Sequence, residues 1–124
     1  MNNTLPDSEY RIMSIIWKAE VALNSSDIMK MLVEENWKAP TVCSYLQRLE
    51  NKGFVVSQKL GKERRYTAAI TKEEYLASET QSFMSEVHKG SFASLINALI
   101  STKSISMEDI EALQLQLEKL KEEE

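Results

Sequence analysis

The feature that most constrains the fold of this chain is a change in the spacing of its apolar residues at Gly53. Before Gly53, apolar residues recur every three or four positions, which is the spacing of one face of an α-helix. After Gly53, "FVVSQKL" and "RRYTAAI" are β-prone runs separated by Gly61, Lys62 and Glu63, and this pattern predicts a hairpin. The chain is therefore expected to combine helices with a small two-stranded ribbon.

Two helices are expected in the first part of the chain. The first begins at Asp7 or Ser8 and ends near Lys18, and its apolar stripe comprises Tyr10, Ile12, Met13, Ile16 and Trp17. Residues 21–23 are too few for more than a bridging strand. Ser25 or Ser26 can cap the second helix, whose apolar residues are Ile28, Met31 and Leu32.

A third helix is expected over residues 40–52, with Pro40 in its first turn and Gly53 just past its end. One face, predicted to meet the core, comprises Val42, Leu46 and Leu49. The opposite face comprises Thr41, Ser44, Gln47, Arg48 and Asn51, with Tyr45 on its flank. Hydroxyl, amide and guanidinium groups bind phosphate oxygens and base edges. Lys38 also precedes the helix N-terminus, where the helix dipole favours an anion, so this face is predicted to lie on DNA.

Three further helices are expected after the hairpin. Thr71 and Glu74 match a capping box for a helix that runs to about Lys89, Gly90 interrupts it, and Ser106 can cap the last helix. This part has too few residues to enclose a core, so its apolar stripes are expected to meet a second copy of the chain. The alternative is that they pack back on the helices before the hairpin. The expected dimer-interface residues are Phe83, Val87, Phe92, Leu95, Ile96, Leu99, Ile110, Leu113, Leu117 and Leu120.

The order helix, short strand, helix, helix, hairpin is that of a winged helix-turn-helix. The predicted fold class is mainly α (α+β), with an N-terminal winged helix-turn-helix, a small β-hairpin wing and a three-helix C-terminal dimerisation tail. The expected domains are a DNA-binding domain over residues 1–71 and a dimerisation region over residues 72–124.

The distribution of charge supports a nucleic-acid partner, although the formal net charge of the 124-residue chain is −4. Residues 38–72 hold 8 Lys or Arg against 2 Asp or Glu, a net of +6, whereas residues 73–124 hold 4 against 11, a net of −7. A polyanion would therefore meet a cationic stripe with an acidic body behind it. From charge alone, a solvated charged face remains an alternative.

Basic residues also gather on the predicted hairpin. Lys59, Lys62, Arg64 and Arg65 flank its turn, where they would face a phosphate backbone or a minor groove. A solvated hairpin explains them equally well when they are considered by themselves. Together with the third helix, they give the expected DNA-binding residues: Lys38, Thr41, Ser44, Tyr45, Gln47, Arg48, Lys62, Arg64 and Arg65.

Enzyme classes find little support in the sequence. Cys43 falls near the boundary between the two faces of the third helix, and His88 is 45 residues away on another element, so a packed or half-buried thiol is expected rather than a nucleophile. The chain lacks a metal-ligand cluster and a phosphate-binding glycine loop, and no catalytic residue, metal or cofactor is expected. The single cysteine suits a reducing cytoplasm, and neither a signal peptide nor a membrane span is predicted.

Three blocks of the sequence resemble the BlaI/MecI/CopY family of bacterial repressors: "LPDSEYRIMSIIWKAE", "TVCSYLQRLENKGFV" and "ERRY". The resemblance implies a cytoplasmic, nucleoid-associated homodimer that binds a palindromic double-stranded operator and blocks transcription. It assigns reading roles to Thr41, Ser44 and Arg48, and wing roles to Arg64 and Tyr66. Ala39-Pro40 stands where Pro-Lys is usual, Ser44-Tyr45 where Thr-Leu is usual, and Ala68 where a second wing tyrosine is usual. These departures leave the operator sequence open.

The resemblance also suggests two ways in which repression could end. Penicillinase-type members are cleaved at an Asn-Phe bond through a sensor-protease pathway, but the corresponding residues 97–99 here are Asn-Ala-Leu. Copper-type members end in paired C-x-C motifs, which this chain lacks. Proteolysis at residues 97–99 and release by a ligand therefore both stay open.

Two other classes of function remain as alternatives. A winged helix can serve as a protein-interaction adaptor that binds no DNA, because a fold does not dictate a function. A PadR-type regulator would share the same DNA-binding mode, since the third-helix block is common to many winged-helix families. The clustered cations on the third helix and the wing favour a DNA-binding repressor over the adaptor.

Overall fold

The computed structural model describes residues 4–123 and divides into two compact units, Met1–Thr80 and Gln81–Glu124. Residues 1–3 and 124, which the predicted domains include, lie outside the described residues. The predicted fold class is confirmed, because six helices accompany one two-stranded antiparallel hairpin in this part of the chain. The predicted domain boundary after residue 71 stays a prediction.

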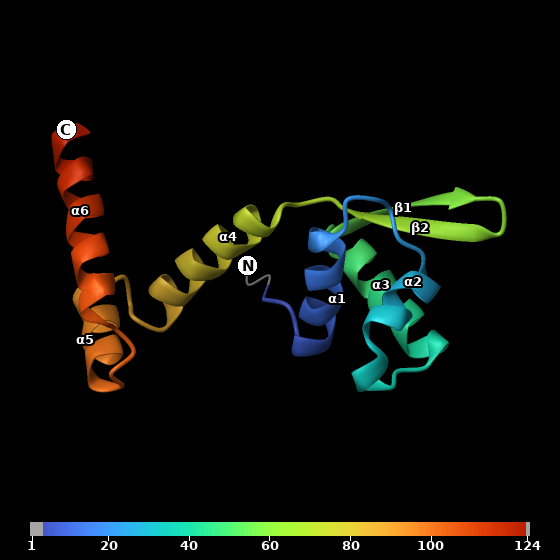
Figure 1. The fold of residues 1–124 in the computed structure, drawn as a ribbon, viewed down its shortest axis with the longest axis horizontal. Coiled ribbons are helices and arrows are strands. Elements are labelled where there is room, and N and C mark those ends of the chain that lie inside the picture. The colour runs from blue at the N-terminus through green and yellow to red at the C-terminus, as the bar shows by residue number, and fades with distance from the viewer. Residues whose placement is uncertain (1–3, 124) are drawn as a thin grey trace. The chain divides into compact units, whose positions relative to one another are not determined.

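The first unit is a winged helix-turn-helix (Figure 1). Its helices are α1 (Asp7–Lys18), α2 (Ser25–Met31) and α3 (Ala39–Asn51), with a short 3-10 turn, η1 (Val33–Glu35), between α2 and α3. The strands β1 (Val55–Leu60) and β2 (Glu63–Ala68) form the hairpin. The three helices pack together, and the hairpin extends from them (Figure 1).

The core of this unit is formed by the apolar faces of the three helices together with residues at the base of the hairpin. The predicted core face of α3 is confirmed, since Val42, Leu46 and Leu49 are fully buried. The buried apolar residues are Leu5, Ile12, Met13, Ile16, Leu23, Ile28, Val42, Leu46, Leu49, Phe54, Val55 and Tyr75. Burial of one face of α3 leaves its polar face outside.

One charged side chain among residues 4–123 is buried. Glu9 of α1 is 2% exposed, and Lys52, directly after α3, donates a hydrogen bond from Nζ to Glu9 Oε1 at 2.7 Å. A buried carboxylate requires a partner of opposite charge or several hydrogen bonds. The pair therefore ties the C-terminal end of α3 to α1, directly before the chain turns at Gly53 with φ of 84°.

The hairpin follows the predicted course with one difference. Val55 pairs with Ala68 and Leu60 pairs with Glu63, so the turn contains two residues and Glu63 belongs to β2. Gly61 has φ of 67°, a left-handed conformation that costs glycine no steric strain. The bridging strand expected at residues 21–23 is confirmed, because Leu23 pairs with Tyr66.

The second helix differs from the sequence prediction at both ends. Its cap is Asn24 rather than Ser25 or Ser26: the Asn24 side chain accepts a hydrogen bond from the Asp27 N–H at 2.7 Å, and the Asp27 carboxylate accepts one from the Asn24 N–H at 3.2 Å. This reciprocal pair satisfies two backbone donors, which a serine one residue later cannot do at this helix start. Met31, one of the three apolar residues expected on this helix, is 60% exposed.

Three helices follow the wing. They are α4 (Lys72–Glu86), α5 (Phe92–Ser101) and α6 (Met107–Glu123), and α4 crosses the boundary between the units. The Thr71–Glu74 capping box is confirmed by reciprocal hydrogen bonds of 3.1 and 3.0 Å, and Ser106 caps α6 together with Asp109. The first of these helices ends three residues before the predicted Lys89. Within residues 4–123, no helix is both long and apolar enough to span a membrane.

Candidate nucleic-acid interface

The outer face of α3 exposes the polar side chains that the sequence predicted. Ser44, Gln47, Arg48 and Asn51 are exposed, whereas Thr41 is half-buried. Gln47 Nε2 donates a hydrogen bond to Asn51 Oδ1 at 3.3 Å, so these two amides partly satisfy each other. The face therefore offers hydroxyl, amide and guanidinium groups in a strip along one helix.

A shallow hollow of about 310 Å³ lies on this strip. It brings together four of the predicted DNA-binding residues, and its lining comprises Pro40, Thr41, Ser44, Tyr45 and Arg48. Lys38 is exposed and occupies the N-cap position, where the helix dipole is positive. Pro40 has no N–H, and the Thr41 and Val42 N–H groups donate to the Lys38 carbonyl, so the positive charge of this helix start comes largely from Lys38.

The wing is joined to α3 by a relay of three side chains. Arg64 Nη1 donates a hydrogen bond to Ser57 Oγ at 2.8 Å, and Ser57 Oγ donates one to Glu50 Oε2 at 2.7 Å. The relay runs from β2 through β1 to α3. It fixes the exposed Arg64 guanidinium near α3 rather than leaving it free at the hairpin tip.

A second hollow, of about 480 Å³, separates the wing from the starts of α2 and α3. It contains the predicted residues Lys62 and Arg64, and its full lining comprises Asn24, Ser25, Ser26, Cys43, Lys62, Glu63, Arg64 and Tyr66. Burial raises the pKa of Tyr66, and the nearby Cys43 and Glu50 raise it further against the opposing effect of Arg64. The Tyr66 hydroxyl is therefore protonated near neutral pH and can donate a hydrogen bond.

Cys43 does not lie where the sequence placed it. Its thiol was expected to be packed or half-buried, but it is exposed. Cys43 follows the fully buried Val42 on α3 and lines the second hollow, between the wing and the helices. Sequence periodicity placed Cys43 at the boundary between two faces, and in the structure that boundary borders the second hollow.

Arg65 is separated from the other predicted DNA-binding residues. Consecutive residues of a strand point to opposite faces, so Arg65 lies on the side of the hairpin away from Arg64. Its guanidinium pairs with Glu63 at 3.1 Å and donates a hydrogen bond to the Ala22 carbonyl at 3.4 Å. The structure therefore brings Arg64 and Lys62 to the α3 side of the wing but does not bring Arg65 there.

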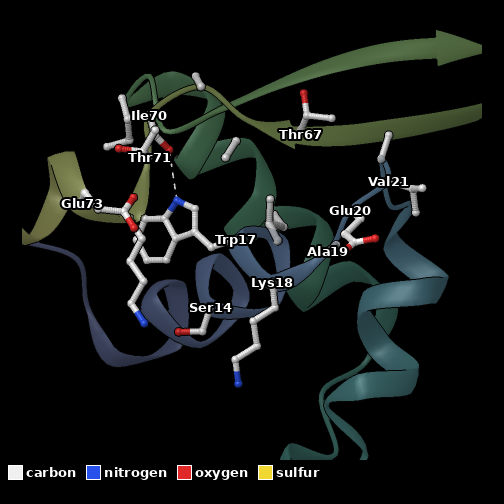
Figure 2. A pocket seen from close by; sticks show the side chains of 15 residues that line it. Ser14, Trp17, Lys18, Ala19, Glu20, Val21, Thr67, Ile70, Thr71 and Glu73 are labelled. Atoms are coloured by element: carbon white, nitrogen blue, oxygen red, sulfur yellow. Dashed lines mark hydrogen bonds between the residues drawn. The ribbon is translucent and has the colours of Figure 1, made fainter.

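A third hollow, of about 600 Å³, lies away from these residues (Figure 2). It is bounded by the end of α1, residues 19–22, the end of β2 and the start of α4. Figure 2 shows the Trp17 indole nitrogen directed at Ile70, whose carbonyl accepts a hydrogen bond from it at 3.0 Å. None of the predicted DNA-binding residues lines this hollow. The hydrogen bond between Trp17 and Ile70 joins α1 to the segment after the wing.

The predicted dimer residues lie in a unit that has no buried side chain among residues 81–123. Phe83, Val87, Phe92, Leu117 and Leu120 are exposed, and Leu95, Ile96, Leu99, Ile110 and Leu113 are half-buried. His88 accepts or donates a hydrogen bond with Ser94 Oγ at 2.9 Å, and its ring packs edge-on against Phe83. Within the described residues, no group of three His, Cys, Asp or Glu side chains could hold a metal ion.

Comparison with known proteins gives consistent matches. Residues 5–119 match the family model described as penicillinase repressor. The methicillin resistance regulatory protein MecI of Staphylococcus aureus is 26% identical over 109 residues, which cover 88% of this chain and 89% of that protein. The penicillinase repressor of Bacillus licheniformis is 28% identical over 118 residues, which cover 94% and 91% of the two chains.

One solved structure supports the fold of the first unit. The DNA-binding domain of the repressor BlaI in solution is 30% identical, with a TM-score of 0.51, and the match covers 58% of this chain and 88% of that one.

Proposed function

Because the chain belongs to the penicillinase repressor family and is a DNA-binding repressor of the BlaI and MecI type, we propose that it acts as a homodimer on a palindromic operator. The observation behind this proposal is one surface of the first unit, on which the polar face of α3 lies beside the wing arginine that Ser57 and Glu50 hold. Residues 40–52 would enter the major groove, and the wing would bind the adjacent backbone.

Each proposed contact has a chemical role. Arg48, Gln47, Ser44 and Thr41 would reach base edges or nearby phosphates, because their side chains share the exposed strip of α3. Cations at the edges of that strip would bind phosphate, and these are Lys38, Lys62 and Arg64. Arg65 would join them only after leaving Glu63 and the Ala22 carbonyl.

A homodimer is proposed because the second unit exposes the apolar residues that would form its interface. The ten predicted interface residues are exposed or half-buried, and burial of apolar surface is the main driving force of association. A two-fold dimer presents two copies of α3, so its operator should be palindromic with half-sites about one helical turn apart. Repression would follow from occupation of a promoter by this dimer.

Proteolytic release at residues 97–99 is compatible with the sequence position but needs a change in structure. These residues lie in the middle of α5, between its start at Phe92 and its end at Ser101. A protease binds an extended segment, so α5 would first have to open locally. We propose that any sensor-protease pathway acting on this chain includes such an opening step.

The direct test of the reading face is the replacement of Arg48 with Ala. We expect the affinity for the operator to fall by about fivefold to 150-fold, because a good arginine–base contact provides about 1–3 kcal/mol. Fluorescence anisotropy with a labelled operator duplex, itself obtained by selection from random DNA, measures this change. Lys30→Ala is the matched control, since it removes one exposed positive charge from α2. Equal affinities of the two variants would contradict the role of Arg48.

The relay from the wing to α3 gives a second expectation. Ser57→Ala removes the hydroxyl that links Arg64 to Glu50, and we expect operator affinity to fall by about fivefold, the effect of one hydrogen bond. Thr67→Ala, on the other face of the hairpin, should leave the affinity unchanged. If Ser57→Ala weakens binding just as much in an Arg64→Ala background, Ser57 acts independently of Arg64. That result would contradict the proposed role of the relay in DNA binding.

A further inference from the structure

Arg48 has an unusual environment for an arginine on a protein surface. Within residues 4–123 its side chain forms no ion pair and no hydrogen bond, and its guanidinium lies over the ring of Tyr45, whose centroid is 5.8 Å from Arg48 Cζ. The two residues are three positions apart on α3, so they are neighbours on one helix face. The aromatic ring is therefore the support that the folded chain gives to this guanidinium.

The Tyr45 ring is itself held in place. It packs edge-to-face against Trp37, with ring centroids 5.2 Å apart and planes at 63°. Both aromatic side chains are half-buried and pack against the core, so the tyrosine is fixed on one side by the body of the winged helix. This leaves its other side for Arg48.

Trp37 is fixed by the backbone that leads into α3. Asn36 has φ of 53°, which closes the 3-10 turn η1, and Glu35 of that turn pairs with Arg11 of α1. On the other side of Trp37, Lys38 has an extended backbone conformation at the N-cap of α3. Trp37 therefore lies between two defined backbone conformations, and its position follows from the fold.

We propose that Tyr45 is a positioning residue for Arg48 and that Trp37 and Tyr45 together hold the guanidinium over the hollow shared with Thr41 and Ser44. This rests on the proposed reading role of Arg48. An arginine side chain loses rotamer freedom when it binds DNA. A ring that already restricts the side chain in the unbound protein reduces that loss. Tyr45 was expected from the sequence to touch DNA; here its contribution comes through Arg48.

A double-mutant cycle tests this assignment with the operator duplex obtained by selection from random DNA. Tyr45→Leu, which installs the residue usual in similar repressors, should lower affinity by about two- to fivefold, the range of an exposed cation–π contact. Tyr45→Phe keeps the ring and should stay within about twofold of the unmodified protein. In an Arg48→Ala background, Tyr45→Leu should have no further effect. Thermal unfolding of each variant separates loss of folding from loss of binding.

The double-mutant cycle distinguishes failure of the positioning role of Tyr45 from failure of the proposed reading role of Arg48. If Arg48→Ala leaves operator affinity unchanged, the reading role of Arg48 fails. If Arg48→Ala weakens binding but Tyr45→Leu does not, the positioning role is wrong. If Tyr45→Phe weakens binding as much as Tyr45→Leu, the hydroxyl contacts DNA directly, and that also overturns the positioning role.

Discussion

Replacement of Lys52 with Met should lower the free energy of unfolding by about 3–5 kcal/mol, because it removes the partner of a buried carboxylate. Glu9 is 2% exposed, whereas the Lys52 side chain is 42% exposed. Methionine preserves the apolar stem of the lysine, so the loss comes from the unpaired charge. Urea unfolding of the full chain at one fixed protein concentration measures it.

The asymmetry of the pair provides the control. Glu9→Gln should cost less than Lys52→Met, because the half-exposed ammonium of Lys52 regains water when its partner loses charge. Replacing both residues with Met should recover much of the stability, as uncharged side chains need no partner. Lys59→Met, which removes an exposed wing lysine with no ion pair among residues 4–123, should have little effect. Equal losses for Lys52→Met and Lys59→Met would contradict a structural role for the pair.

Replacement of Leu117 with Glu should convert the proposed dimer to a monomer. Leu117 belongs to the α6 stripe formed with Ile110, Leu113 and Leu120, and it is 43% exposed in the single chain. In a dimer this side chain would be buried, and a buried unpaired carboxylate is strongly unfavourable. Analytical ultracentrifugation at micromolar concentration should show the change in mass.

Loss of the proposed dimer should also weaken operator binding by about a hundredfold or more, because two linked DNA-binding domains bind far more tightly than one. Leu115→Glu is the matched control: Leu115 is 58% exposed but lies on the opposite side of α6 from the stripe. It should leave both the mass and the affinity unchanged. A Leu117→Glu variant that stays dimeric would show that α6 is not the interface.

Much of the winged helix could be predicted from the sequence because local pattern and tertiary structure agree there. The α3 stripe is an example, since the three residues predicted to be core are fully buried. The hairpin was also predictable, from β-prone runs around a turn, and residues 21–23 were too few for more than the observed Leu23 bridge. The cap of α2 was predicted one or two residues too late, because two serines follow Asn24. The structure instead has a capping box in which Asn24 and Asp27 exchange hydrogen bonds.

The candidate site was less predictable because its geometry depends on contacts between elements. The link from Arg64 through Ser57 to Glu50 joins three segments, and no local pattern in the sequence indicates it. Strand alternation could have separated Arg64 from Arg65, since consecutive residues face opposite ways. The exposure of Cys43 depends on the hollow between the wing and the helices, which is a tertiary property.

Selection of bound sequences from random duplex DNA, across a series of salt concentrations, tests whether the protein is a dimeric repressor that reads a palindrome. We expect an enriched palindrome with half-sites about one helical turn apart. We also expect an affinity that falls steeply with salt, because several phosphates are neutralised. Salt-sensitive binding without an enriched motif, or an enriched motif without two-fold symmetry, would contradict a dimeric repressor.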